Sequence, residues 1–266
     1  MNEGIILAVI VITIIGIVCA IVLSVASKVM YVYEDERVGI ARECLPGANC
    51  GACGFPGCDG YAKALVEDPD LSLTLCPPGG ADCVVALADA LGREAGEIVK
   101  QVAVLHCCGD TDSTSDKMEY QGLSTCAGAK LVYGGKGKCA FSCMGLGDCI
   151  EVCPENAMWI DGGIVRIDPD MCTGCGLCTK VCPNNLLAVH KATDNVVVTC
   201  SNHEKGAATR KQCSKGCIAC KLCEKKCERD AIHVIDNVAV IDYEKCNACG
   251  ECVAACKLGC IEVKAV

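Results

Sequence analysis

The segment CTGCGLCTKVC, residues 172–182, carries four cysteines in the spacing C-x2-C-x2-C-x3-C. The same spacing occurs twice more, at residues 217–227 and 246–256. In proteins that bind two cubane clusters, such a run supplies three thiolates to one iron–sulfur cluster and its fourth to the neighbouring cluster. The runs therefore predict [4Fe–4S] sites and a protein that transfers electrons. Their cysteines are Cys172, Cys175, Cys178 and Cys182; Cys217, Cys220, Cys223 and Cys227; and Cys246, Cys249, Cys252 and Cys256.

The cysteine content agrees better with iron–sulfur clusters than with disulfides or zinc sites. Disulfide scaffolds are typical of small secreted chains with even cysteine counts, whereas this chain has 29 cysteines in 266 residues. Disulfides inside C-x2-C-x2-C would be strained. A zinc site needs only two C-x2-C pairs, so the third close cysteine of each run would be superfluous. We therefore expect iron–sulfur clusters.

The overall composition supports a fold that depends on its metal sites. Aromatic residues make up only 3% of the chain, so a large aromatic core is not available. Metal binding supplies much of the folding free energy of small metal-binding domains, and we expect the cysteine-rich part to be largely unfolded without its clusters. The formal net charge of −9 argues against general nucleic-acid binding.

The N-terminal segment predicts a membrane anchor. Between Glu3 and Lys28 lie 24 residues without a charge, which as a helix would extend roughly 36 Å and could cross a hydrocarbon core of about 30 Å. A cleaved signal peptide is the alternative, but it would have a basic start and a shorter apolar stretch. Because Lys28, Arg37 and Arg42 follow the span, the positive-inside rule places the body of the protein in the cytoplasm.

A second kind of cysteine motif follows the anchor. Cys50, Cys53 and Cys58 stand in a glycine-rich loop, and Cys76 completes a set of four for one cluster. Glycines let the backbone wrap closely and direct N–H groups at sulfur. We expect a polar stalk at 34–43, a short helix at 59–68 and an amphipathic helix at 81–95.

The C-terminal half contains an internal duplication. The fourth cysteine of one run and the first cysteine of the next are 19 positions apart in both copies, at Cys153 and Cys172 and at Cys227 and Cys246. Each connector alternates apolar and polar residues around a turn, Asp161-Gly162-Gly163 or Asp236-Asn237, and so predicts a β-hairpin. The pattern is that of a two-cluster ferredoxin module, written twice.

The first run of the first module departs from the regular spacing, since Cys139, Cys143, Cys149 and Cys153 read C-x3-C-x5-C-x3-C. We expect its cluster to be retained in altered surroundings. Because the fourth cysteine crosses over, four ligand sets are predicted: Cys139, Cys143, Cys149 and Cys182; Cys172, Cys175, Cys178 and Cys153; Cys217, Cys220, Cys223 and Cys256; and Cys246, Cys249, Cys252 and Cys227.

With the N-terminal set, five [4Fe–4S] clusters use twenty cysteines and nine remain. Four of the nine, Cys107 (or Cys108), Cys126, Cys200 and Cys213, could meet and hold a sixth cluster, or they are unligated buried thiols. About 24 rather than 20 iron atoms per chain would distinguish the two interpretations. Five further cysteines have no assigned cluster: Cys19, Cys44, Cys83, Cys108 and Cys260. Of these, we expect Cys19 to be a small residue in the span, Cys44 a structural residue and Cys83 a buried thiol.

These observations predict an α+β fold with one N-terminal transmembrane helix, a small N-terminal 4Fe–4S domain and two tandem bacterial-type 2[4Fe–4S] ferredoxin modules. The predicted boundaries are a transmembrane anchor at 1–33, the N-terminal 4Fe–4S domain at 34–95, a connecting segment at 96–133, the first ferredoxin module at 134–195 and the second at 196–266.

The arrangement closely resembles the RnfB family of the Rnf complex, the membrane-bound, ion-pumping ferredoxin:NAD+ oxidoreductase of anaerobic bacteria. The matching stretches are the anchor, LPGANCGACGFPGCDGYAKAL at 45–65, CPPGG at 76–80, GLGDCIEVCPENAM at 145–158 and GCIACKLCEKKC at 216–227. The resemblance implies a protein that takes electrons from reduced soluble ferredoxin and passes them to membrane subunits and finally to NAD+. Sister subunits of that family hold the flavins and the NAD site, so no catalytic acid or base is expected here.

Soluble ferredoxins are typically acidic, and docking on a chain of charge −9 needs a local basic surface. Residues 203–229 include the cysteine run at 217–227 and contain eight basic and three acidic residues. Electrostatic steering at this surface is one interpretation, and an ordinary solvated loop is the other. The candidate docking residues are Lys211, Lys215, Lys221, Lys225, Lys226 and Arg229.

Three other functions are weighed against this one. An electron-wire subunit of a hydrogenase or formate dehydrogenase would share the ferredoxin runs but not the motif at Cys50–Cys76. A redox sensor would need one labile cluster and an output domain. A zinc-binding structural protein would be colourless when purified.

Overall fold

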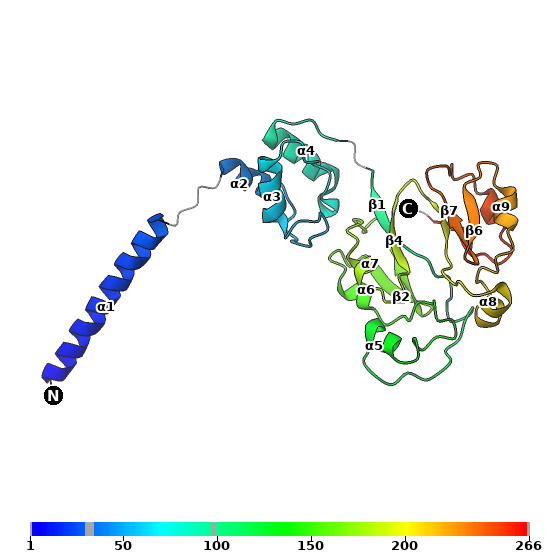
Figure 1. The fold of residues 1–266 in the computed structure, drawn as a ribbon, viewed down its shortest axis with the longest axis horizontal. Helices are drawn as coiled ribbons and strands as arrows, with labels where there is room; N and C mark the ends of the chain where they lie inside the picture. Colours follow the sequence, from blue (N-terminus) through cyan, green and yellow to red (C-terminus); the bar gives the residue numbers. More distant parts are fainter. Residues whose placement is uncertain (1, 30–34, 97–98, 265–266) are drawn as a thin grey trace.

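The computed structural model describes residues 2–29, 35–96 and 99–264. Short helices alternate with short strands, and all the strands in these ranges pair in four two-stranded antiparallel sheets. Figure 1 shows the helical N-terminal part and the mixed part that follows it. The mixed helix and strand content agrees with the predicted α+β class.

The first helix, α1 (Asn2–Val29), contains the one candidate membrane span found among the described residues, Ile10–Lys28. The span has a mean hydropathy of 2.8 and none of it is buried in the protein. An exposed apolar helix of this length agrees with the predicted anchor. The rest of the predicted anchor, residues 1 and 30–33, lies outside the described residues.

The N-terminal 4Fe–4S domain is a small helical unit. Its elements are α2 (Glu36–Glu43), α3 (Cys58–Glu67), the 3-10 helix η1 (Pro77–Gly79) and α4 (Gly80–Leu91). The helices α2, α3 and α4 share one core, in which Tyr61 and Leu87 are fully buried. The Tyr61 hydroxyl donates a hydrogen bond of 2.8 Å to the carbonyl of Ser72 and fixes the loop that leads to Cys76.

The polar stalk expected at 34–43 is wrong, because α2 occupies residues 36–43. The Asp35 carboxylate accepts a hydrogen bond from the N–H of Arg37 and caps the helix, and Ala41 is fully buried against the neighbouring helices. Arg42 also bonds Asp59 across the domain at 2.7 Å. A capping residue and one small apolar position are enough here, since the partner helices supply the rest of the core.

Two sheets lie in the first ferredoxin module, and one of them includes β1 from the connecting segment predicted at 96–133. Strand β1 pairs with β4, so that Gln101 faces Lys191 and Leu105 faces Leu187. The predicted hairpin is confirmed as β2 and β3. The sequence run 98–105 is strand-like, and β1 begins at Gln101; Ile98 lies outside the described residues. The elements are β1 (Gln101–Leu105), α5 (Cys126–Leu131), α6 (Asp148–Glu151), β2 (Met158–Asp161), β3 (Ile164–Ile167), α7 (Leu177–Val181) and β4 (Leu187–Lys191).

The second module repeats this plan. Strand β5 pairs with β8, and the second predicted hairpin is confirmed as β6 and β7. In both modules the first strand is separated from the cysteine runs by an insertion, at 106–138 in the first module and 199–216 in the second. The elements are β5 (Val196–Val198), α8 (Gly206–Gln212), α9 (Leu222–Lys226), β6 (Ile232–Ile235), β7 (Val238–Ile241), α10 (Glu251–Ala255) and β8 (Ile261–Val263).

Candidate iron–sulfur sites

The three regular cysteine runs share one backbone conformation. Two residues after the first cysteine, the chain has a positive φ of 68° at Gly174, 57° at Ala219 and 56° at Ala248. Two residues further on, φ is positive again, and a short helix begins that carries the third cysteine; these residues are Gly176, Lys221 and Gly250. Such left-handed positions turn successive N–H groups towards one point, a geometry suited to an anionic cluster.

Three cavities each combine cysteines of one run with the last cysteine of the partner run. One cavity of about 130 Å³ is lined by Cys217, Cys220, Cys223 and Cys256, with Cys260 beside them. A second is lined by Cys227, Cys246, Cys249 and Cys252. The third is lined by Cys153, Cys172, Cys175 and Cys178. In each case the cysteines are those that the crossing rule assigns to one cluster.

Backbone N–H groups donate hydrogen bonds to several of these sulfur atoms. Ala103 N–H donates to Cys172 Sγ at 3.3 Å, Leu186 N–H to Cys182 Sγ at 3.4 Å and Ala231 N–H to Cys227 Sγ at 3.3 Å. A thiolate is a better acceptor than a neutral thiol because its charge strengthens the bond. The donors are therefore placed for thiolates that ligate metal.

Two buried thiols of these sites are hard to ionise on their own. Burial, together with nearby cysteines, raises the pKa of Cys149 and of Cys178 to about 12. A free thiol of this kind would stay protonated at neutral pH. Iron ligation requires the thiolate, and the positive charge of the metal compensates for the lost solvation. The sites are thus suited to a bound cation cluster rather than to free reactive cysteines.

In the N-terminal domain three of the four candidate ligands, Cys53, Cys58 and Cys76, belong to one core around the start of α3 and η1. Cys58 is the first residue of α3, and its N–H bonds Asn49 Oδ1 at 2.9 Å. Cys58 and Cys76 are both buried, and Cys53 packs against their core. The expected buried thiol Cys83 lies against Cys76, whose sulfur is hydrogen-bonded to it.

The altered first run is placed differently from the prediction. Cys182 lies close enough to raise the pKa values of Cys143 and Cys149, and Cys143 also raises the pKa of Cys149. Cys126, which the sequence pattern does not assign to this set, lies close to Cys143 and Cys149. Cys139 lines another cavity instead, together with cysteines outside the regular runs.

Among the described residues, no three His, Cys, Asp or Glu side chains converge on a point where one metal ion could bind. Thiolates around a cubane stand further apart than ligands of one ion, since four irons and four sulfides lie between them. The four-cysteine cavities fit this wider spacing.

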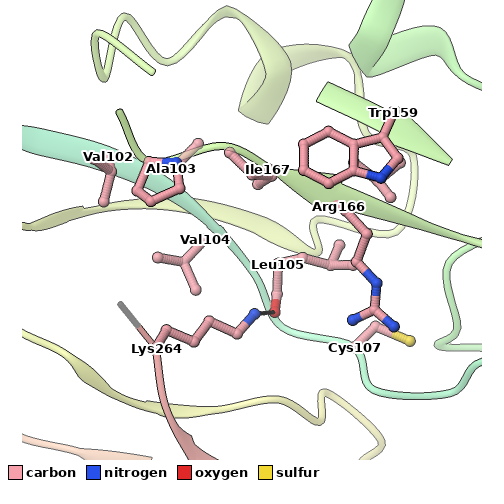
Figure 2. Close-up of a pocket in the computed structure, with 11 residues that line it drawn as sticks. Val102, Ala103, Val104, Leu105, Cys107, Trp159, Arg166, Ile167 and Lys264 are labelled. Carbon is pink, nitrogen blue, oxygen red and sulfur yellow. Dashed lines mark hydrogen bonds between the residues drawn. The ribbon is translucent and has the colours of Figure 1, made fainter. Parts of the chain in front are cut away.

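A larger cavity, of about 270 Å³, lies over β1 and β3 and is not a cluster site. Figure 2 shows Val102, Val104 and Leu105 in its wall, with Trp159, Arg166 and Cys107 on one side and Lys264 on the other. The Lys264 ammonium donates a hydrogen bond of 3.4 Å to the carbonyl of Leu105. Burial lowers the pKa of Lys264.

Two of the eight basic residues of 203–229 lie beside the site of Cys217, Cys220, Cys223 and Cys256. Arg210 and Lys221 line the cavity of Cys217, and Cys220 is exposed there. Lys215 is bonded to Asp110 at 2.9 Å and Lys221 pairs with Glu224 at 3.5 Å. Of the candidate docking residues, Lys215 is half-buried and the others are exposed: Lys211, Lys221, Lys225, Lys226 and Arg229.

Comparison with known proteins agrees with these sites. Residues 45–78 match a family described as a putative Fe-S cluster, and residues 165–187 and 239–262 match the 4Fe-4S binding domain. The chain is 42% identical to the B subunit of the Na(+)-translocating ferredoxin:NAD(+) oxidoreductase complex of Acetobacterium woodii, over 92% of this chain and 74% of that protein.

Two further relatives cover both chains almost completely. The B subunit of the proton-translocating ferredoxin:NAD(+) oxidoreductase complex of Clostridium ljungdahlii is 39% identical over 97% of this chain and 92% of its own. The B subunit of the ion-translocating oxidoreductase complex of Methanosarcina acetivorans is 36% identical over 94% of each chain.

Fold and sites together define an iron–sulfur protein of the ferredoxin class, built from an apolar N-terminal helix, a 4Fe–4S domain and tandem ferredoxin modules. More particularly, the chain belongs to the RnfB family, the B subunits of the ion-translocating (Rnf) oxidoreductase complexes.

Proposed function

We propose that this chain is the electron-entry component of a membrane-bound, ion-translocating oxidoreductase. It would accept electrons from reduced soluble ferredoxin and pass them towards the membrane subunits and finally NAD+. Its clusters, when bound, supply one-electron redox chemistry. The protein's own part is to ligate, position and shield them, and no side chain acts as acid, base or nucleophile.

The observation that carries this proposal is the sharing of cavities across runs. In three cavities, three cysteines of one run meet the fourth cysteine of its partner. The ligand sets proposed there are Cys172, Cys175, Cys178 and Cys153; Cys217, Cys220, Cys223 and Cys256; and Cys246, Cys249, Cys252 and Cys227. Cys50, Cys53, Cys58 and Cys76 are proposed for the N-terminal cluster.

The spacing of the sites supports a relay. The thiol of Cys50 is close enough to Cys175 to raise its pKa, so the N-terminal site lies near the first module. Within the first module, Cys149 is similarly close to Cys178. Most candidate ligand cysteines are buried or half-buried, and Cys220 and Cys249 are exposed, so water has limited access to most of the sites.

The anchor and the comparisons support a place in a larger complex. The relatives are named as subunits of complexes, and a span of 19 residues cannot by itself form an ion path. Because Lys28, Arg37 and Arg42 follow the span, we infer that the ferredoxin modules face the cytoplasm.

The direct experiment is anaerobic purification of the membrane complex and an assay of ferredoxin-dependent NAD+ reduction. We expect a brown complex that reduces NAD+ with reduced ferredoxin and whose activity is lost without this chain. Co-purification with a hydrogenase or formate dehydrogenase, and no NAD+ reduction, would instead support the wire subunit of another oxidoreductase.

Ferredoxin docking is proposed for the surface around Cys220. This cysteine is exposed, and Lys225 and Lys226 form no ion pair among the described residues. An acidic partner would be attracted to this surface, and long-range attraction of this kind raises association rates.

Charge reversal tests the docking site. Lys225→Glu/Lys226→Glu should lower the rate of ferredoxin oxidation about tenfold at low ionic strength and flatten its salt dependence. Lys180→Glu is the matched control, because Lys180 stands at the corresponding position of α7 in the first module. Equal rates and equal salt dependence in both variants would show that ferredoxin docks elsewhere.

A further inference from the structure

The altered run of the first module has the backbone of a regular run when it is counted from Cys143. Two residues after Cys143, Gly145 has a φ of 63°, and four residues after it, Gly147 has a φ of 93°. These are the positions of Gly174 and Gly176 in the neighbouring run. As in the regular runs, a short helix that carries the third cysteine begins after the second of these residues. Cys143 is therefore the first cysteine of the run, and Cys139 lies outside it.

When the run is counted from Cys143, its second ligand position is not a cysteine. Leu146 stands three residues after Cys143 and three before Cys149, where the regular runs have Cys175, Cys220 and Cys249. Without a thiol from another part of the chain, this cluster site would have only three cysteine ligands, Cys143, Cys149 and Cys182.

Cys126 lies at this ligand position, although it precedes Leu146 by 20 positions in the sequence. Its sulfur lies within reach of the backbone N–H groups of Asp148, Leu146 and Gly147. The position is fixed by Asp148, whose carboxylate accepts from the N–H of Cys126 at 2.6 Å and from the N–H of Ala127 at 3.0 Å. The start of α5 is thus tied directly to the residue before Cys149.

Cys139, which does not belong to the run in this register, lines a different cavity. Its neighbours there include Cys107, Cys200 and Cys213. A Cβ atom placed on Gly109 would lie 3.6 Å from Cys107 Sγ and 3.7 Å from Cys213 Sγ, so both sulfurs face the same space.

The donors around this cavity resemble those of the regular sites. Cys143 N–H donates to Cys107 Sγ at 3.4 Å, and Cys217 N–H donates to Cys200 Sγ at 3.3 Å. The buried amide of Asn202 donates to Cys139 Sγ at 3.3 Å. These hydrogen bonds are of the same kind as those that Cys172, Cys182 and Cys227 receive.

The same contacts distinguish Cys107 from its neighbour Cys108. Cys107 accepts a backbone N–H, as a thiolate ligand would. The Cys108 sulfur instead lies 3.7 Å from the carbonyl oxygen of Lys215, to which only a protonated thiol can donate. Cys107 is therefore the ligand candidate of the two.

We propose that Cys126 replaces the missing second cysteine of the first run, giving the set Cys126, Cys143, Cys149 and Cys182, and that Cys107, Cys139, Cys200 and Cys213 hold a sixth [4Fe–4S] cluster between the two modules. The proposal rests on the proposed function, since it assumes cluster binding in the regular runs. It exchanges Cys126 and Cys139 between the two ligand sets that the sequence predicts.

Metal content and EPR spectra of the anaerobically purified full chain test this exchange. The unmodified protein should contain about 24 iron atoms and as many sulfides. Cys126→Ala and Cys149→Ala should lose the same EPR component of the reduced protein, whereas Cys139→Ala and Cys213→Ala should both lose a different one. Cys108→Ala is the matched control and should keep every component.

Paired variants separate the two sets. Cys139→Ala/Cys213→Ala should lose no more than one component, because both cysteines serve one cluster. Cys126→Ala/Cys139→Ala should lose two. If the latter pair lost only one component, or if Cys126→Ala kept the full iron content, the exchange would be wrong.

A rescue variant covers the case in which Cys126→Ala does not fold. Cys126→Ala/Leu146→Cys restores the regular C-x2-C-x2-C spacing, and the lost EPR component and iron should return. Failure of this rescue in a protein that keeps its other clusters would contradict the position assigned to Cys126. If the unmodified protein contained no iron, the proposed function itself would be contradicted. If it contained 20 iron atoms, and Cys139→Ala and Cys149→Ala lost the same EPR component, only the exchange would be contradicted.

Discussion

At the scale of single residues, the sites depend on positions with a positive φ. The first of the two positions in each run is glycine in the first module, at Gly145 and Gly174, and alanine in the second, at Ala219 and Ala248. A non-glycine residue pays about 1–2 kcal/mol for this conformation. The first module also has a spatial reason for glycine, because a Cβ atom on Gly145 would collide with the carbonyl oxygen of Gly163.

Exchange of these residues tests that reason. Gly145→Ala should destabilise the first module by about 2 kcal/mol or more, from φ strain together with the collision. Ala219→Gly, at the corresponding position of the second module, should leave stability unchanged or raise it slightly. The measurement is the midpoint temperature at which the visible absorbance of the anaerobic protein is lost. An unchanged midpoint in Gly145→Ala would show that the hairpin turn can move away.

At the scale of elements, the two insertions join the modules. The N–H of Ser214 donates to the carbonyl of Ser113 at 2.9 Å, and Thr114 Oγ1 donates to the carbonyl of Gln212 at 2.8 Å. Asp110 accepts from Ser113 and from the Lys215 ammonium. The segments 106–138 and 199–216 thus form one structure from parts far apart in the sequence.

The charge of Asp110 should matter for this contact. Burial raises the pKa of Asp110, but the hydrogen bonds from Ser113 and Lys215 outweigh it, and the pKa lies below its usual value. The contribution to stability is therefore present above about pH 3.9 and is lost as the pH falls through the lowered pKa.

At neutral pH, Asp110→Asn should cost about 1.5 kcal/mol and speed amide exchange at Ser214 about tenfold. Asp112→Asn, an exposed carboxylate in the same loop, is the control and should change nothing. Equal exchange in both variants would mean that the backbone bonds alone hold the insertions together.

At the scale of the whole molecule, three small cores replace one large core. One lies in the N-terminal domain and one in each ferredoxin module, and cysteines belong to all three. The sheets have only two strands each, and such hairpins are marginally stable by themselves. The bound clusters must therefore supply much of the folding free energy.

Removal of iron tests this dependence. After chelation under reducing, anaerobic conditions in detergent, circular dichroism should lose the strand signal and the short helices of residues 99–264. Helix α1 should remain, because its apolar residues are held by the detergent and need no metal. A full native spectrum in iron-free protein would show that the protein cores suffice.

The sequence alone determined the class of site, the two hairpins, the amphipathic helix at α4 and the apolar span, because each depends on local spacing or periodicity. It did not reveal α2, which is stabilised by its neighbours. It also could not place Cys126 and Cys139, since Cys126 is 20 positions away from Leu146 and the cavity of Cys139 combines two insertions. Local spacing identifies ligands within one run, but only tertiary contacts decide which distant thiols complete a site.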